Sequence, residues 1–154
     1  MIKNHKLAEE IKNRLQGKYE IYSVYGFHEG IELLPLSPLE FANCFSHFDC
    51  VVTEFFHETC FSIKNNAKFI SVDTEKIYLT YESKIRNLLG KLGLSDRYID
   101  MTDCMDGEKM DLLIHKIEQN VSEASYPSFE EKLAPFVEET NRYLDSIRND
   151  LSAR

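Results

Sequence analysis

The sequence predicts an α/β fold, a Rossmann-like parallel sheet with helices on both faces. Short apolar runs alternate with segments of helical periodicity, and these runs lack the strict alternation of half-exposed strands. Strands and helices that take turns at short spacing are typical of a parallel sheet covered on both sides. With 154 residues and 43% hydrophobic composition, the chain has material for a single domain, residues 1–154.

Spacing and turn residues predict the elements of the first half. Apolar residues recur at helical spacing from Leu7 to Leu15, which indicates a helix that Gly17 can end. Ser37 and Glu40 have the spacing of a capping box, with proline at the first helical position, and so predict a short helix. The expected elements are a helix at 4–16, a strand at 19–25, a short helix from 38 and a strand at 49–54.

The second half continues the alternation. An apolar stripe that includes Ile85, Leu89 and Leu92 predicts an amphipathic helix that Gly93 closes. Pro135 should bend the last helix near its start. The expected elements are a helix from Phe56 to about Asn65, a strand at 68–73, a helix from Thr80, a strand at 97–101, and helices that begin at Asp106 and Ser128.

We also expect a gap in the sheet. A Rossmann-like unit normally starts with a strand, whereas this sequence starts with the helix at 4–16. The position between strand 19–25 and strand 49–53 therefore lacks its usual occupant. Because exposed strand edges invite pairing, we expect either closure of the gap within the chain or a dimer that covers it.

Composition excludes several functions. The formal net charge of −8 argues against a nucleic-acid partner, which needs a clustered basic face. No apolar stretch approaches the roughly 18 to 20 residues of a membrane span, and the charged N-terminus is not a signal peptide, so we expect a cytoplasmic protein. The cysteines form no metal-binding pattern, which predicts reduced, mostly buried thiols and no metal site. They are Cys44, Cys50, Cys60 and Cys104.

His57 lies where the strand at 49–54 gives way to its helix. In parallel sheets, ligands bind beyond the carboxyl ends of the strands. The unpaired amides and the dipole of a helix start favour an anion there, and an imidazole can add charge or a proton. From spacing alone, a functional histidine and a structural histidine at a helix start remain equally open.

Three segments resemble one family. The segment 37–74, SPLEFANCFSHFDCVVTEFFHETCFSIKNNAKFISVDT, resembles the signature of the polysaccharide pyruvyl transferases, with its Ser-Pro-x-Glu-Phe helix, buried strand, Phe-His-Gly-Thr-like turn and Phe-Ser-Ile. The segment 83–99, SKIRNLLGKLGLSDRYI, is similar to the family's Ser-Lys-x-Arg-x-Leu-Leu segment, and the C-terminal helix resembles the closing helix of the family. The resemblance covers most of 37–100 and, more loosely, the rest.

The resemblance implies one half of a GT-B fold, the C-terminal half of an enzyme that moves the pyruvyl unit of phosphoenolpyruvate onto two sugar hydroxyls as a ketal. His57 matches the family's motif histidine in the phosphoenolpyruvate site and is the expected catalytic residue. The implied partners are a saccharide acceptor and either a missing N-terminal half or a homodimer partner; phosphoenolpyruvate is the donor, and no cofactor is needed. The implied substrate-binding residues are Glu58, Thr59, Ser83, Lys84 and Arg86.

Two positions depart from the family pattern. Phe55 stands where many members have Arg, and Glu58 stands where the family usually has Gly. A carboxylate beside an anion site repels the ligand, so we expect Glu58→Gly to strengthen phosphoenolpyruvate binding. Two alternatives stay open, a non-catalytic ligand-binding or interaction domain of the same fold and half of a GT-B nucleotide-sugar glycosyltransferase. For Thr59 and for Ser83 to Arg86, a helix-turn hydrogen bond and solvated helix charges are the competing interpretations.

Overall fold

The computed structural model describes residues 1–75, 83–102, 107–124 and 128–152. The expected helix starts at Thr80 and Asp106 lie outside these residues, as does Cys104. Within the described residues the fold is α/β, with two small parallel sheets and helices around them. The predicted fold class is therefore confirmed at this level.

The larger sheet has three parallel strands in the order β3-β4-β5. They are β3 (Val51–Thr53), β4 (Phe69–Asp73) and β5 (Tyr98–Asp100). In register, Val52 lies opposite Ile70, and Val72 lies opposite Ile99. Three of the four expected strands thus form the expected parallel sheet.

The prediction of a fourth strand at 19–25 is wrong in extent and in partner. Only β1 (Tyr22–Ser23) is extended, and it pairs in parallel with β2 (Glu32–Leu33) in a separate sheet. The Ser23 hydroxyl donates to the carbonyls of Tyr25 and Gly26, which turns the chain just after β1. A longer strand at 19–25 would also leave the backbone groups of its β3 side unpaired. Among the described residues, no strand lies next to β3 on the side away from β4.

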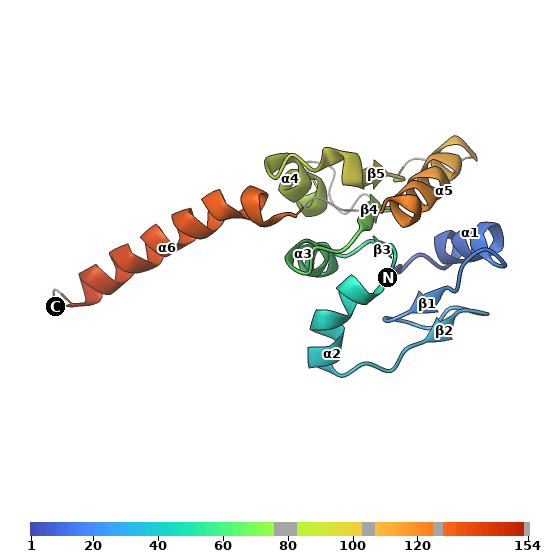
Figure 1. Ribbon diagram of the computed structural model, residues 1–154, viewed down its shortest axis with the longest axis horizontal. Helices are drawn as coiled ribbons and strands as arrows, with labels where there is room; N and C mark the ends of the chain where they lie inside the picture. The colour runs from blue at the N-terminus through green and yellow to red at the C-terminus, as the bar shows by residue number, and fades with distance from the viewer. Residues whose placement is uncertain (76–82, 103–106, 125–127, 153–154) are drawn as a thin grey trace.

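Helices cover both faces of the larger sheet (Figure 1). On one face α1 (His5–Leu15) and α5 (Gly107–Ser122) pack on the sheet, and on the other face α3 (Phe56–Lys64) and α4 (Lys84–Lys91) do. Side chains alternate along β4, so Ile70 and Val72 join the first core and Phe69 joins the second. Each of these three side chains is fully buried, which contributes roughly 1.5 to 3 kcal/mol apiece.

Caps and turn residues set the bounds of the remaining helices. The predicted capping box is present at α2 (Pro38–Asn43), where Ser37 and Glu40 each bond the other's backbone amide. The 3-10 helix η1 (Cys44–His47) follows it, and a second 3-10 helix, η2 (Ser95–Arg97), leads into β5. Gly93 has φ +63 just after α4, a conformation that suits glycine at a helix end.

The last helix, α6 (Glu130–Ser152), projects from the rest of the molecule (Figure 1). Its start is anchored, because Phe129 and Leu133 pack into the core between α3, α4 and β3. Pro135 lies inside the helix and does not end it. Beyond that point apolar side chains face solvent; Val137 and Tyr143 are 55% and 66% exposed.

The expected gap beside β3 is present as a cavity of about 550 Å³. Residues 19–24 line one side of this cavity and residues 47–52 line the other. Met1 closes one end of it, because its ammonium donates to the Val52 carbonyl and its own carbonyl accepts from the Glu54 amide at 3.1 Å. Met1 therefore pairs with β3 in parallel.

Among the described residues, no helix combines the length and the apolar character needed to cross a lipid bilayer.

Candidate functional site

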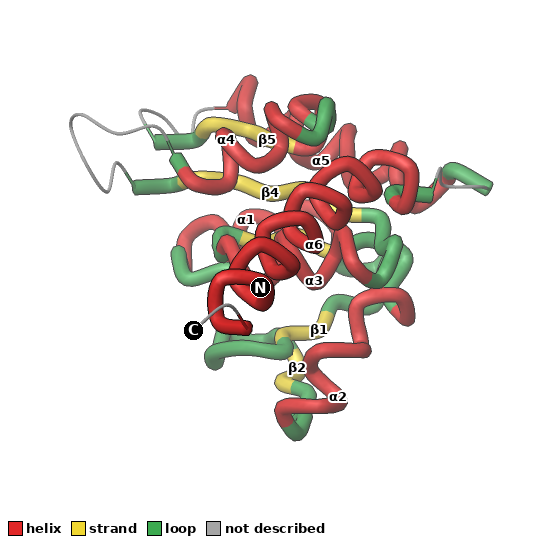
Figure 2. Tube along the Cα trace, turned by 90° about the vertical axis from the view of Figure 1, so that its left-hand side faces the viewer, coloured by secondary structure: helices red, strands yellow, loops and turns green. Residues whose placement is uncertain are grey.

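The candidate site lies at the carboxyl edge of the larger sheet, where three helices begin. The helix α3 starts three residues after β3 ends, and α4 starts on the way from β4 to β5, so both run back across the sheet from that edge. The start of α1 lies there too, because Lys3 and Asn4 contact Glu54. Figure 2, turned by 90° from Figure 1, shows β4 and β5 of this sheet side by side. Helix starts and strand ends are thus gathered where parallel sheets bind ligands.

The start of α3 differs from the starts of α1, α2 and α4. Asn4, Ser37 and Ser83 each accept a hydrogen bond from the first turn of α1, α2 and α4. In α3 the N-cap residue is Phe55, whose side chain has no acceptor to offer. The first helical bond runs from the Thr59 amide to the Phe55 carbonyl at 3.0 Å, so the amides of 56–58 are left for another acceptor. This helix start can therefore bind an anion or a ligand carbonyl.

His57 is the second residue of α3 and its side chain is exposed. The imidazole lies edge-on to the Phe56 ring, with the ring centroids 5.8 Å apart. The exposure of the ring contradicts the alternative of a buried structural histidine at this helix start. His57 does not line the cavity beside β3 or the smaller one near Arg86. It therefore stands at an open helix start and is accessible to a ligand from solvent.

Glu58 turns inward instead of across the helix start. Its side chain is 5% exposed, and the Thr53 hydroxyl donates to its carboxylate. Burial raises the pKa of Glu58, while the Thr53 hydrogen bond and the nearby Met1 ammonium oppose that rise. The Met1 ammonium is itself buried, which lowers its pKa, and the charge of Glu58 partly restores it. The carboxylate thus points inward, toward the Thr53 hydroxyl and near the Met1 charge. We expected Glu58 to obstruct an anion at this helix start, and the inward position does not fit that expectation.

Thr59 is fully buried and has two hydrogen bonds of its own. Its hydroxyl donates to the Phe55 carbonyl at 3.0 Å and lies 2.8 Å from the Ser71 hydroxyl on β4. The interpretation as a hydrogen bond within the first helical turn is confirmed. Thr59 fixes α3 to the sheet and so holds the exposed His57 in place.

At the start of α4, one residue caps the helix and two charged residues are exposed. Ser83 is the N-cap, and its hydroxyl accepts from the Arg86 amide at 3.3 Å. Lys84 and Arg86 are exposed. Arg86 also lines a second cavity of about 340 Å³, together with Ser95, Tyr98 and Asp100. The structure thus brings these residues to the same sheet edge as His57, at the start of the neighbouring helix.

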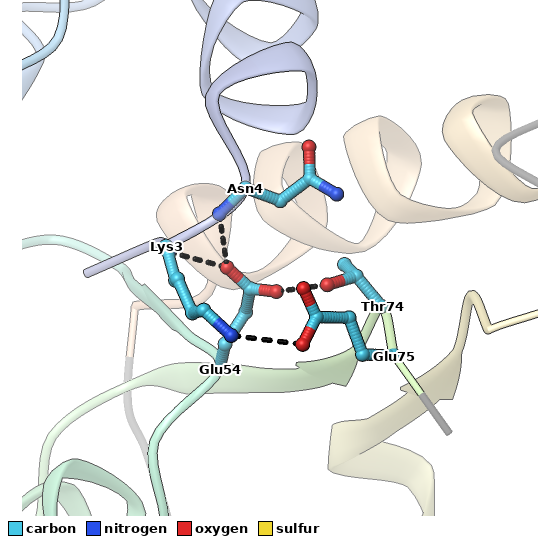
Figure 3. Close-up of polar contacts among 5 residues, drawn as sticks. All are labelled: Lys3, Asn4, Glu54, Thr74 and Glu75. Carbon is cyan, nitrogen blue, oxygen red and sulfur yellow. Dashed lines mark hydrogen bonds and ion pairs between the residues drawn. The ribbon is translucent and has the colours of Figure 1, made fainter. Parts of the chain in front are cut away.

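Glu54 is a key residue of this edge that the sequence did not single out (Figure 3). Its carboxylate accepts from the backbone amides of Lys3 and Asn4, the latter at 2.8 Å, and from the Thr74 hydroxyl. Lys3 also forms an ion pair with Glu75 at 2.8 Å. The only sequence signal was an acidic residue at the end of an apolar strand. Glu54 ties the start of α1 to the ends of β3 and β4.

Two further carboxylates at the edge are also occupied by protein donors. The Tyr98 hydroxyl donates to Asp73 at 2.7 Å, and burial together with this bond raises the pKa of Tyr98. Thr102 donates to Asp100 from its hydroxyl at 2.6 Å and from its amide at 3.0 Å, and the hydroxyl bond lowers the pKa of Asp100. These acidic groups make the β4 and β5 side of the edge less favourable to an anion than the start of α3.

Within the parts of the chain that the structure describes, no three His, Cys, Asp or Glu side chains are grouped so as to hold a metal ion. Comparison with protein-family models, with curated proteins and with solved structures found no match for this chain.

Proposed function

We propose that this chain is the phosphoenolpyruvate-binding half of a pyruvyl transferase-like enzyme of surface-polysaccharide synthesis. The observation that carries the proposal is the start of α3, which has no side-chain cap and presents the exposed His57. Amides at a helix start favour a phosphate or carboxylate, and phosphoenolpyruvate has both. The sheet and its covering helices are compatible with one Rossmann-like half of a GT-B enzyme.

The chemistry assigns a role to each group. In the transfer, the methylene of phosphoenolpyruvate takes up a proton, two sugar hydroxyls add to the adjacent carbon and lose their protons, and phosphate leaves. His57 is placed to give the proton or to neutralise the anion. Lys84 and Arg86, exposed at the start of α4, can attract the same anion from the neighbouring helix. A second half would supply the saccharide acceptor site and the remaining catalytic groups.

A second candidate is a non-catalytic interaction domain of the same fold. One observation favours it: Glu54, Asp73 and Asp100 are all bonded to protein donors. Phe55 also replaces the Arg that many family members use for phosphate. Such a domain would keep the helix start but bind no donor.

Titration followed by amide NMR tests the proposal. Phosphoenolpyruvate should shift the amides of 56–58 first, and His57→Ala should weaken its binding about tenfold, the loss of one charge-assisted hydrogen bond. His115→Ala is the matched control, because His115 is an exposed histidine on α5. Neither variant should change the melting temperature, since both side chains are exposed.

Two other ligand results would contradict the proposal. Binding of a uridine diphosphate sugar at the same amides, without binding of phosphoenolpyruvate, would identify a glycosyltransferase half. Failure of both ligands to shift any amide at the start of α3 would favour the interaction domain. Equal phosphoenolpyruvate affinity in His57→Ala and in the unmodified protein would remove His57 from the site.

A further inference from the structure

The helix α6 carries an apolar stripe that the described residues leave exposed. The stripe starts at Leu133, which packs into the core, and continues along the part of the helix that projects from the molecule (Figure 1). Six large apolar side chains of this projecting part are between 37% and 67% exposed: Phe136, Val137, Tyr143, Leu144, Ile147 and Leu151. A helix with one apolar face normally packs that face against another element.

The spacing of the stripe is that of a seam between two helices. Intervals of four, three, four, three and four residues separate Leu133, Val137, Thr140, Leu144, Ile147 and Leu151. Such intervals place these residues at the d and a positions of a heptad, the narrow face along which two helices pack. The Thr140 hydroxyl donates to the Phe136 carbonyl at 2.8 Å, so Thr140 can be buried in the seam without losing a hydrogen bond. The stripe therefore fits a second helix.

The two flanks of this seam differ in polarity. Phe136 and Tyr143 stand at the g positions, whereas Asn141 and Arg148 stand at the e positions. In a parallel pair of identical helices, each g flank faces the e flank of the partner. In an antiparallel pair, the g flank of each helix faces the g flank of the other. Two copies of α6 thus bring their apolar flanks together only when they are antiparallel.

The charges along α6 favour the same direction. Residues 130–139 contain four carboxylates and one lysine, a net charge of −3, whereas residues 140–149 contain Arg142, Asp145 and Arg148, a net charge of +1. An antiparallel pair places the acidic half of each helix beside the basic half of the other, and a parallel pair places the two acidic halves together. The acidic half also disfavours a membrane surface, which attracts helices that are rich in lysine and arginine.

We propose that the exposed stripe of α6 is the interface of a homodimer, in which α6 of a second copy packs on it antiparallel. Around a two-fold axis level with residue 142, Val137 packs against Ile147 and Thr140 packs against Leu144 of the second copy. At roughly 150 to 200 Å² for a fully exposed large side chain, each copy contributes roughly 500 Å² of apolar surface. The pair buries about 1,000 Å², the size of a specific but weak interface, so the chains separate at low micromolar concentration. This proposal does not rest on the proposed anion site.

Sedimentation equilibrium tests the association, from about 10 μM to about 1 mM protein, the range of a weak interface. The average mass should rise from 18.0 kDa toward twice that value. Leu144→Asp would bury a charge in the seam and should weaken association on the order of a hundredfold. Asn149→Asp is the matched control, because it adds the same charge at an exposed position away from the seam, and its dissociation constant should change less than about twofold. Both variants should keep the unfolding midpoint of the core, since neither residue belongs to it.

Paired cysteine variants test the direction. A mixture of the Val137→Cys and Ile147→Cys proteins should form a disulfide between the two positions under mild oxidation, because these positions lie opposite each other only in the antiparallel pair. Mass spectrometry of peptides identifies the joined positions. A disulfide between two copies of Val137→Cys would overturn the antiparallel direction. A mass of 18.0 kDa at every concentration would overturn the homodimer in favour of a different partner for α6. Equal weakening by Leu144→Asp and Asn149→Asp would overturn the stripe as the interface.

Discussion

Replacing Glu54 by alanine is expected to detach the start of α1 from the sheet edge. The Glu54 carboxylate is the acceptor for the amides of Lys3 and Asn4 and for the Thr74 hydroxyl. The substitution removes all three bonds at once and provides no other acceptor. Met1 should be affected as well, because its carbonyl accepts from the Glu54 amide and its position depends on the residues that follow it.

The size of the effect follows from the charge and burial of the group. A hydrogen bond to a charged acceptor contributes about 1.5 to 3 kcal/mol when it is well buried. Glu54 is only half-buried, so water replaces part of the loss and we expect about 2 to 3 kcal/mol in total. For a chain of this length that corresponds to a fall in melting temperature of about 5 to 10 °C. Glu54→Gln keeps one carbonyl oxygen and should recover about half of the loss.

The assay is urea unfolding, with Glu75→Ala as the matched control. Glu75 holds Lys3 in the same cluster, but both side chains are more than half exposed, at 61% and 63%. An exposed ion pair of this kind contributes little, so Glu75→Ala should leave the unfolding midpoint almost unchanged. If Glu54→Ala were no more destabilising than Glu75→Ala, the assignment of Glu54 as the tie between α1 and the sheet would be refuted.

Two further predictions concern buried ionisable groups. Burial raises the pKa of Glu58 above its ordinary value of 4.5, so the folded state favours its protonated form and stability is lost as pH rises through the folded pKa. Glu58→Gln should therefore gain stability relative to the unmodified protein as the pH rises above 4.5 in unfolding experiments, and a difference between the two proteins that does not change with pH would contradict this. Burial raises the pKa of the Cys50 thiol to about 12, so iodoacetamide should modify Cys50 after Cys44 and Cys60. Mass spectrometry of the folded protein checks the order, and early modification of Cys50 would count against it.

Local patterns predicted much of the fold. The capping box at Ser37 and the helix from Phe56 are encoded within a few residues, and both are where the sequence placed them. The strand at 19–25 was overestimated for a definable reason. Tyr19 and Ile21 are apolar because they pack at the edge of a core and line the cavity beside β3, and not because they belong to a strand.

The candidate site was less predictable, because its key contacts are distant in sequence. Met1 meets Val52 across 51 positions, and Glu54 meets Thr74 across 20. Periodicity contains no information about such pairs. Glu58 could not be placed from local sequence either. A charged residue in the first turn of a helix suggests exposure, yet Glu58 is buried, with Thr53 as hydrogen-bond donor and the Met1 ammonium nearby.

The projecting helix α6 should behave as a nearly independent helix–coil system. Its 23 residues span about 35 Å, and among the described side chains of this region the core holds Phe129, just before the helix, and Leu133 in its first turn. Most helical stability in proteins comes from tertiary packing, and the Asp145–Arg148 pair at 3.3 Å adds only a little to the rest of α6. Warming should therefore shorten α6 progressively from its C-terminal side, and the far-ultraviolet circular dichroism should decline along a slope before the cooperative unfolding of the α/β core begins.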